Sequence, residues 1–221
     1  MVFESKLFLS GNYDFLLSAT VVTVELSAIG ILSGLVIGSI IGLTRTIRSK
    51  VLIVPKLAAI LYVESFRRVP LILLILFSFY LLAITGFKVS TFFVASFAIS
   101  IYSGAYMAET IRAGIEAIRP QQWDAARALG LSTFQQVFYI ILPQAVRVIV
   151  PPTIGFSIGL VKDTSLASII EVVDLTYAAQ IVRYKTAESF SVFSAVMLLY
   201  FLICYPLSKL GQYTERRFRT T

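Results

Sequence analysis

Residues 26–44 read LSAIGILSGLVIGSIIGLT and contain no aspartate, glutamate, lysine or arginine. A helix needs about 20 consecutive, mostly apolar residues to cross the hydrocarbon core of a bilayer. Three further segments of 17 to 20 residues also lack these four residue types, namely 70–86, 89–108 and 189–208. A fifth segment, 140–161, is interrupted only by Arg147. The sequence therefore predicts an all-α, polytopic membrane protein with five transmembrane helices.

The composition of the whole chain agrees with this prediction. Apolar residues make up 57% of the 221 residues and charged residues only 14%, whereas about a quarter of the residues in soluble domains are charged. We expect a single transmembrane domain over residues 1–221. Its predicted spans are about 16–44, 70–86, 89–111, 143–162 and 188–209.

The beginning of the second span has two interpretations. The preceding segment, 52–66, is apolar but contains Pro55, Lys56 and Glu64. It forms either an interfacial helix, after which Pro70 opens the span, or the first part of a continuous, kinked span.

Small residues recur at every fourth position of the first span, at Gly30, Gly34, Gly38 and Gly42. This spacing lines one face of a helix and lets a second helix approach closely. We expect that face to pack against another transmembrane helix, within the subunit or in a second subunit.

The distribution of basic residues predicts the orientation in the membrane. Five crossings put the two termini on opposite sides, with 14 lysines and arginines on one side and 5 on the other. The fourteen are Arg45, Arg48, Lys50, Lys56, Arg67, Arg68, Arg112, Arg119, Arg127, Arg147, Lys209, Arg216, Arg217 and Arg219. Because basic residues are enriched in cytoplasmic loops, we expect the N terminus outside and the C terminus in the cytoplasm. The net charge of +7 then reflects topology and not nucleic-acid binding.

Several classes of chemistry are excluded by residue counts. The chain contains no histidine, and its one cysteine, Cys204, lies inside the fifth predicted span. Disulfide frameworks and histidine-based metal sites or catalytic triads are therefore excluded. The sequence also has no glycine-rich ATP-binding loop, so we expect a protein that is not an enzyme and binds no metal or cofactor itself.

The sizeable hydrophilic loop, about residues 118–142, is predicted to lie in the cytoplasm. Pro120 suits the first turn of a helix, and residues 121–129 are good helix formers. Gly130 can adopt the left-handed conformation that ends this helix, and Ser132 or Thr133 can cap the next one.

Within this loop, residues 124–130 read DAARALG and are followed after eleven residues by Leu142 and Pro143. This pattern resembles the EAA loop of ABC importer permeases, with aspartate in place of glutamate. The resemblance implies the fold of a type I ABC importer permease, in which this loop docks on the ATP-hydrolysing subunit. The implied coupling residues are Asp124, Ala125, Ala126, Ala128, Leu129 and Gly130.

Four further strings narrow the resemblance to the permeases for polar amino acids. They are FRRVPL at 66–71, GAYMAETIRAG at 104–114, LPQA at 142–145 and VKDTSL at 161–166. The resemblance implies a subunit of the bacterial inner membrane that works with an ABC ATPase dimer, an extracytoplasmic substrate-binding protein and a second permease copy or homologue. ATP and Mg²⁺ would bind to the ATPase, and the substrate would be a polar amino acid.

Charged residues inside predicted spans indicate where the substrate passes, because such residues are costly unless paired or hydrated. Residues 162–165, KDTS, interrupt the fourth span before a short predicted gate helix, 166–173. The resemblance places this break near the substrate path, where Asp163 can bind an ammonium group and Ser165 or free amides a carboxylate. Pairing of Asp163 with Lys162, or capping of the gate helix, is the alternative role. The full predicted path consists of Tyr102, Tyr106, Glu109, Lys162, Asp163, Thr164 and Ser165.

Two of these assignments have simpler alternatives. Glu109 lies one turn before Arg112, which favours an ion pair within the helix. Tyr102 and Tyr106 can serve as packing residues. At the level of the whole chain, a stand-alone secondary transporter or channel is the first alternative function, although no internal repeat is evident. A membrane scaffold is the second, and the letters of the loop argue against it.

Overall fold

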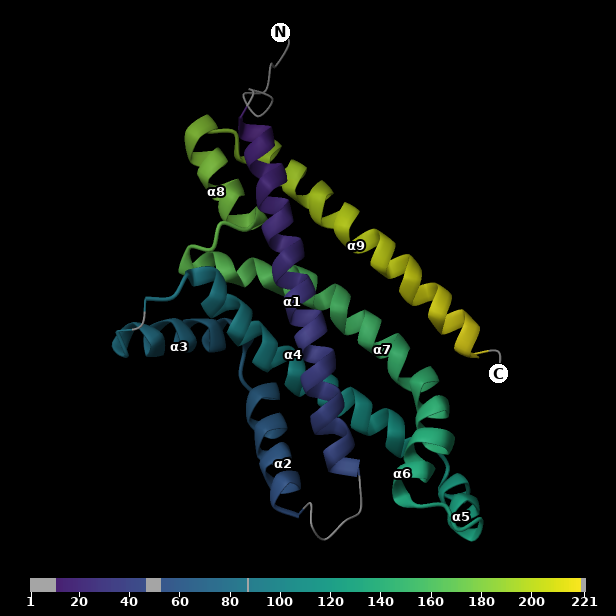
Figure 1. Cartoon of the computed structure of the whole chain (residues 1–221). Coiled ribbons are helices and arrows are strands. Elements are labelled where there is room, and N and C mark those ends of the chain that lie inside the picture. Colours follow the sequence, from purple (N-terminus) through teal and green to yellow (C-terminus); the bar gives the residue numbers. More distant parts are fainter. Residues whose placement is uncertain (1–10, 47–52, 87, 220–221) are drawn as a thin grey trace. The chain divides into compact units, whose positions relative to one another are not determined.

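The computed structural model describes residues 11–46, 53–86 and 88–219, and all the regular structure in these residues is helical. The first half contains α1 (Asn12–Thr46), α2 (Ile53–Arg67), α3 (Leu71–Ile84), α4 (Thr91–Glu116) and α5 (Pro120–Ala128). The second half contains α6 (Thr133–Gln135), the π-helical turn η3 (Gln136–Ile141), α7 (Leu142–Asp163), the 3₁₀ helix η4 (Thr164–Ile170), α8 (Leu175–Thr186) and α9 (Ser189–Arg219). Figure 1 shows this order along the chain. The predicted all-α class is confirmed.

Four helical segments in the described residues are long and apolar enough to cross a membrane. They are Asn12–Thr46, Thr91–Glu116, Thr133–Ile170 and Ser189–Phe218. Helices α2 and α3 meet the same criterion only as a pair, and the pair is bent by 106° at its break. The described chain therefore has four candidate spans, or five when the bent pair counts as one.

The bend between α2 and α3 lies at Pro70. This proline is the N-cap of α3, with φ −58° and ψ 138°, and its carbonyl accepts the amide hydrogens of Leu73 and Leu74. Because proline lacks an amide hydrogen and disfavours a helical residue before it, α2 cannot continue through this position. Helix α3 has only 14 residues, which corresponds to about 21 Å at 1.5 Å per residue.

The helices form two compact units. The first unit takes the described parts of Met1–Ile31, Pro70–Ser100 and Ser157–Leu207. The second takes those of Leu32–Val69, Ile101–Phe156 and Ser208–Thr221. Helices α1, α4, α7 and α9 each contribute to both units.

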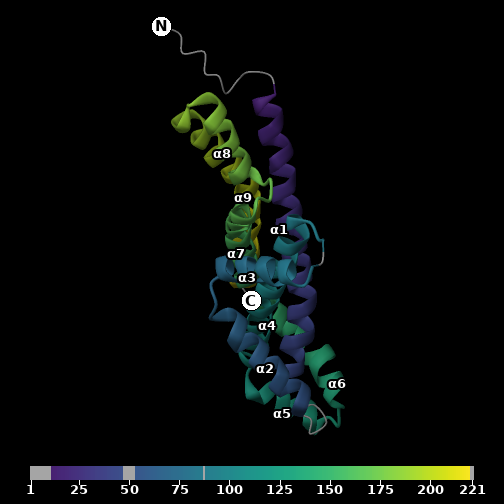
Figure 2. The same cartoon turned by 90° about the vertical axis from the view of Figure 1, so that its left-hand side faces the viewer.

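In the first unit, the core joins the beginning of α1 to α8 and α9. Its buried residues are Leu16, Ala19, Leu175, Ala178, Ala179, Val182, Val192 and Val196. Figure 2 shows α8 near the N-terminal part of α1. The amide of Leu175 also donates a hydrogen bond of 3.0 Å to the Thr23 hydroxyl, so the start of α8 is held to α1 by a polar contact.

In the second unit, the glycine face of α1 packs directly on α4, as the spacing of four residues between the glycines predicted. A Cβ atom added to Gly38 would lie 2.4 Å from the Met107 Cβ and 2.8 Å from the Ala108 nitrogen. A Cβ added to Gly34 would lie 2.8 Å from the Ser103 hydroxyl oxygen. Only glycine permits this approach, because real Cβ atoms do not come so close to backbone atoms.

Candidate coupling loop and translocation residues

Helix α5 has the boundaries that its turn residues dictate. Pro120 is the first helical residue, and Arg119 precedes it with an extended backbone. At the other end Gly130 has φ +71°. Its amide donates to the Arg127 carbonyl at 2.9 Å, and the Leu131 amide donates to the Ala126 carbonyl at 3.2 Å. This pair of bonds is a Schellman motif, which requires a left-handed residue and favours glycine there. The predicted helix end at Gly130 is confirmed.

The next helix, α6, begins with a capping box. The Ser132 hydroxyl accepts the Gln135 amide at 3.4 Å, and the Gln135 side chain accepts the Ser132 amide at 2.9 Å. Ser132, one of the two predicted caps, is therefore the residue used. Only a few residues separate the end of α5 from the cap of α6. The Schellman motif at Gly130 and the capping box at Ser132 therefore fix the direction of α5 relative to α6.

Five of the six predicted coupling residues are exposed, and the sixth, Ala126, is buried. Asp124 forms an ion pair with Arg127 on the exposed side of α5. On the inner side, Trp123 packs against a buried cluster of Ile111, Ile115, Ile141, Ala145 and Ile149. The Gln144 side chain adds a hydrogen bond of 3.2 Å to Gln122. One side of helix α5 thus packs on the protein through Trp123 and Gln122, and its other side is a surface that no described residue covers.

The turn η3 between α6 and α7 is a feature that the sequence did not predict. It is π-helical over six residues and includes the buried Gln136, Val137 and Ile141. The Gln136 side-chain amide donates to the Leu131 carbonyl at 2.7 Å, which ties η3 back to the end of α5. Single π-helical turns are rare and occur often at functional positions.

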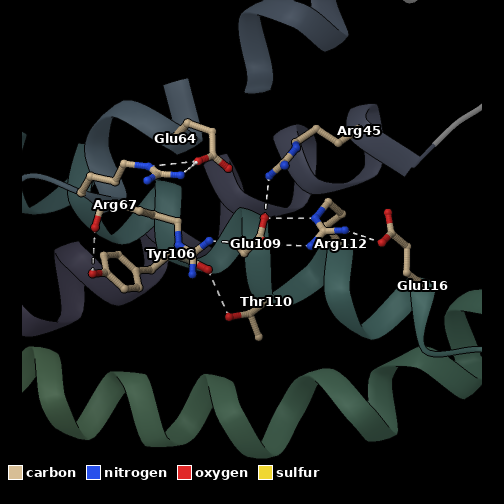
Figure 3. A network of polar contacts seen from close by, with 9 residues as sticks. Arg45, Glu64, Arg67, Tyr106, Glu109, Thr110, Arg112 and Glu116 are labelled. Carbon is tan, nitrogen blue, oxygen red and sulfur yellow. Dashed lines mark hydrogen bonds and ion pairs between the residues drawn. The ribbon is translucent and has the colours of Figure 1, made fainter. Parts of the chain in front are cut away.

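Glu109 of α4 lies in the second unit and contacts three arginines (Figure 3). One carboxylate oxygen lies 2.7 Å from an Arg45 nitrogen and 3.0 Å from the Arg112 Nε. The other lies 2.6 Å from Arg112 and 3.4 Å from an Arg67 nitrogen. Glu109 is only 20% exposed and Arg45 only 9%. The expected Glu109–Arg112 pair is present, and Arg45 of α1 and Arg67 of α2 extend it to two further helices.

Tyr102 and Tyr106 lie beside this network. Their ring centroids are 4.6 Å apart, and Tyr106 stacks on Phe156 of α7 at 5.2 Å. The Tyr106 hydroxyl donates to the Arg67 carbonyl at 3.2 Å, and the Arg67 guanidinium lies 5.4 Å from the Tyr106 ring. Both tyrosines are half-buried, so part of each ring remains accessible.

In the first unit, the structure shows a change of helix type at the position of the predicted break in the fourth span. Helix α7 ends at Asp163, and the chain continues directly as η4. This 3₁₀ helix begins two residues before the start of the predicted gate helix and ends three residues before its end. Thr164 is buried, and its hydroxyl donates to the Val161 carbonyl at 2.8 Å. Lys162 is exposed, whereas Asp163 and Ser165 are half-buried. Among the described residues Asp163 forms no ion pair with Lys162 and no side-chain capping bond.

The seven predicted path residues thus divide between the two units. Tyr102, Tyr106 and Glu109 belong to the second unit, and residues 162–165 to the first. Each group is connected within its own unit.

The count of basic residues that predicts the orientation in the membrane includes Lys6, Arg48 and Lys50, which lie outside the described residues.

Asp174 is a polar residue that sequence reasoning missed. It is fully buried at the start of α8, where one carboxylate oxygen accepts the Tyr177 amide at 2.9 Å. The other oxygen is buried and has no hydrogen-bond partner in the described chain. Burial raises the pKa of Asp174 to about 6, although hydrogen bonds from the backbone oppose the rise. The position of an aspartate just before a helix predicts a cap, but nothing local predicts its burial.

The candidate spans, the bent α2–α3 pair and the capped α5 loop together define a permease of the ABC importer class. The chain belongs to the family of binding-protein-dependent transport system inner membrane components, whose model matches residues 34–220.

Among its relatives is the probable glutamine ABC transporter permease protein GlnP of Bacillus subtilis (strain 168), which is 37% identical over 206 residues, covering 92% of this chain and 93% of the relative. The putative glutamine transport system permease protein GlnP of Rickettsia conorii is 33% identical and is covered to 92%, as is this chain.

Solved structures show the same fold. A crystal structure of an amino acid ABC transporter with histidines matches 93% of this chain and 94% of its own, with a TM-score of 0.84 and 32% identity. An inward-facing structure of the MetNI methionine ABC transporter matches 92% of this chain and 96% of its own, with a TM-score of 0.75. At 20% identity, this second likeness concerns the fold alone.

Proposed function

We propose that the chain is the translocation subunit of an ATP-driven importer for polar amino acids in a bacterial inner membrane. The observation that carries the proposal is α5, a short helix fixed by a Schellman motif at Gly130 and packed from below through Trp123. Its other side presents Asp124, Ala125 and Ala128 to a partner. The relatives named as glutamine permeases and the related amino acid transporter support the substrate class.

The proposed partners follow from what the chain contains. It has no ATP-binding loop of its own, so an ABC ATPase dimer carrying ATP and Mg²⁺ would dock on the exposed side of α5. A substrate-binding protein would deliver the amino acid from outside, and a second permease copy or homologue would complete the pathway. In this arrangement α5 and the C terminus lie in the cytoplasm, and the N terminus lies outside.

Within the membrane we propose that Asp163 contacts the ammonium group of the substrate. Its carboxylate lies where α7 gives way to η4, is half-buried, and has no ion pair among the described residues. A buried carboxylate without a cationic partner is costly, and an ammonium group would offset that cost. Thr164 and Ser165 follow it at the break, whereas Glu109 is already surrounded by arginines.

Uptake by reconstituted vesicles tests this proposal. The permease, its ATPase and its binding protein would be assembled, and ATP-dependent accumulation of a radiolabelled polar amino acid measured. We expect Asp163→Asn to reduce uptake at least tenfold while assembly and basal ATP hydrolysis persist. Asp14→Asn is the matched control, because Asp14 is exposed in the first turn of α1. Normal uptake by Asp163→Asn would remove Asp163 from the pathway, and ATP-independent uptake would favour a secondary transporter or channel.

A further inference from the structure

A cavity of about 470 Å³ lies in the second unit, apart from the residues predicted for coupling and for the substrate path. Its wall is formed by the end of α1, the beginning of α2, the end of α4, helix α5, and the α6–η3 segment. This volume falls within the range of about 300 to 1,000 Å³ that is typical of ligand sites.

The charged residues that line the cavity carry an excess of positive charge. They are Arg45, Lys56, Arg127 and Glu116. Glu116 is paired with Arg112, Arg127 with Asp124 and Arg45 with Glu109, and none of these three partners belongs to the wall. Lys56 forms no ion pair with any residue that the structure describes. The cavity therefore attracts an anion, and its arginine and lysine groups suit a phosphate.

Arg45 contributes positive charge to the wall although its guanidinium is already paired. Its side chain is 9% exposed, and one terminal nitrogen is bound to Glu109. Its Nε is buried and has no hydrogen-bond partner in the described part of the chain. Because this nitrogen has almost no accessible surface, a ligand in the cavity does not reach it, and Lys56 is the basic residue of the wall that forms no ion pair with the described residues.

The position of the cavity indicates which anion it meets. Arg45 and Thr46 are the last residues of candidate span Asn12–Thr46, Glu116 ends Thr91–Glu116, and Thr133 begins Thr133–Ile170. Three candidate spans thus end at its wall. Because membrane spans end where the hydrocarbon meets the headgroup region, we infer that the cavity lies near lipid headgroups. Ile115, Trp123 and Val137 provide an apolar part of the wall, and tryptophan is enriched at this depth.

We propose that this cavity binds the headgroup of an anionic phospholipid, with Lys56 facing the phosphate and the apolar wall receiving the first carbons of the acyl chains. Basic cavities between membrane helices commonly recognise such headgroups. Because helix α5 and η3 both contribute to the wall, the bound lipid would hold the coupling loop against the ends of α1 and α4. The lipid would thereby become part of the structure that supports α5.

Native mass spectrometry of the full-length, delipidated protein tests the proposal. Phosphatidylglycerol would be titrated into the protein and into the variants Lys56→Gln and Lys56→Arg. Each basic residue near a headgroup contributes enough binding energy to change affinity about fivefold. We expect Lys56→Gln to weaken binding by about that factor and Lys56→Arg to preserve it. Lys56 is only partly buried, so neither change should unfold the chain, and melting curves would verify this.

The control is Arg147→Gln, which removes one exposed positive charge of α7 outside the cavity. Equal weakening by Arg147→Gln and Lys56→Gln would show general charge attraction and overturn the proposal, as would unchanged binding in Lys56→Gln. Glycerol 1-phosphate that binds as tightly as the lipid would identify a soluble phosphate ester as the ligand instead. Loss of the lipid when the ATPase joins, with weaker assembly of Lys56→Gln, would assign the cavity to that partner.

Discussion

At the scale of single residues, Glu109 shows how much depends on one carboxylate. Its two oxygens contact guanidinium groups from α1, α2 and α4. Arg45 is almost fully buried, so its charge cannot turn to water when the carboxylate is removed. Removing one member of a buried ion pair costs more than forming the pair gains, because the remaining charge stays desolvated.

The first prediction is that Glu109→Gln destabilises the second unit by about 3 kcal/mol. Thermal unfolding in detergent would measure the change. Glu116→Gln is the control, because Glu116 pairs with the same Arg112 but is 54% exposed, and exposed pairs contribute only about 0 to 1 kcal/mol. Equal melting temperatures for the two variants would contradict the prediction, because they would show that the buried ion pairs of Glu109 stabilise the fold no more than the exposed pair of Glu116.

Asp174 gives a second prediction, which concerns pH. Its pKa is about 6 in the folded protein, above the ordinary 3.8, because the charged form is buried. The folded state therefore holds the proton more tightly than the unfolded state between these values. Stability should fall as pH rises from about 4 to about 6 and stay level above that range.

Unfolding curves at several pH values would test this dependence. Asp174→Asn keeps an oxygen for the Tyr177 amide but has no charge to bury. Its free energy of unfolding should therefore increase relative to that of the parent protein as pH rises. The difference should reach on the order of 2 to 3 kcal/mol above pH 6. Asp14→Asn, at an exposed position, should follow the parent at every pH. Parallel curves for Asp174→Asn and the parent would contradict the assigned pKa.

At the scale of elements, the α5 loop depends on the conformation of Gly130. No atom of the described residues lies within 4 Å of the position that a Cβ would take there, so a Cβ would meet no obstacle among them. The cost of a substitution comes from φ +71° alone, about 1 to 2 kcal/mol for a β-branched residue. That cost is enough to favour another turn and redirect α5.

The third prediction compares two side chains at this position. Gly130→Val should insert in the membrane normally but lose most of the ATP hydrolysis that the loaded binding protein stimulates. Gly130→Asn should retain it, because asparagine accepts the left-handed conformation. Hydrolysis would be measured in vesicles with and without the loaded binding protein. If valine and asparagine behave alike, the turn geometry is not what couples the two subunits.

Local signals predicted some of these elements and not others. Proline at 120, glycine at 130 and serine at 132 act on their immediate neighbours, so both ends of α5 and the beginning of α6 could be predicted from the sequence. The contact between Arg45 and Glu109 joins residues 64 positions apart. It depends on how α1 packs on α4, which sequence spacing alone does not determine. The π-helical turn η3 reads QVFYII and contains no proline or glycine that would predict a turn.

At the scale of the whole molecule, the asymmetric distribution of charge predicts the orientation in the membrane. Arg45, Lys56, Glu116 and Arg127 line one cavity in the second unit, at the ends of candidate spans. These positions include three of the basic residues assigned to the cytoplasm. Moving arginine or lysine across the hydrocarbon is costly, so the orientation that leaves them in the cytoplasm is favoured.

The fourth prediction is the resulting topology. Reporter fusions after Gly86 should be active outside, and fusions after Gln121 or at the C terminus should be active in the cytoplasm. Paired reporters, one active on each side, provide the internal control. A reversed pattern would leave α5 out of reach of a cytoplasmic ATPase and remove the importer proposal.

The arrangement of contacts around α5 has a mechanical consequence. Trp123 joins the helix to the cluster that links α4 with α7 and η3, and Glu109 clamps α4 to α1 and α2. Through these contacts we expect α5 to move together with the elements that it touches in the second unit. A push on α5 is therefore not absorbed near the point where it is applied. We expect it to reach the parts of α4, α7 and η3 that Trp123 contacts within the second unit.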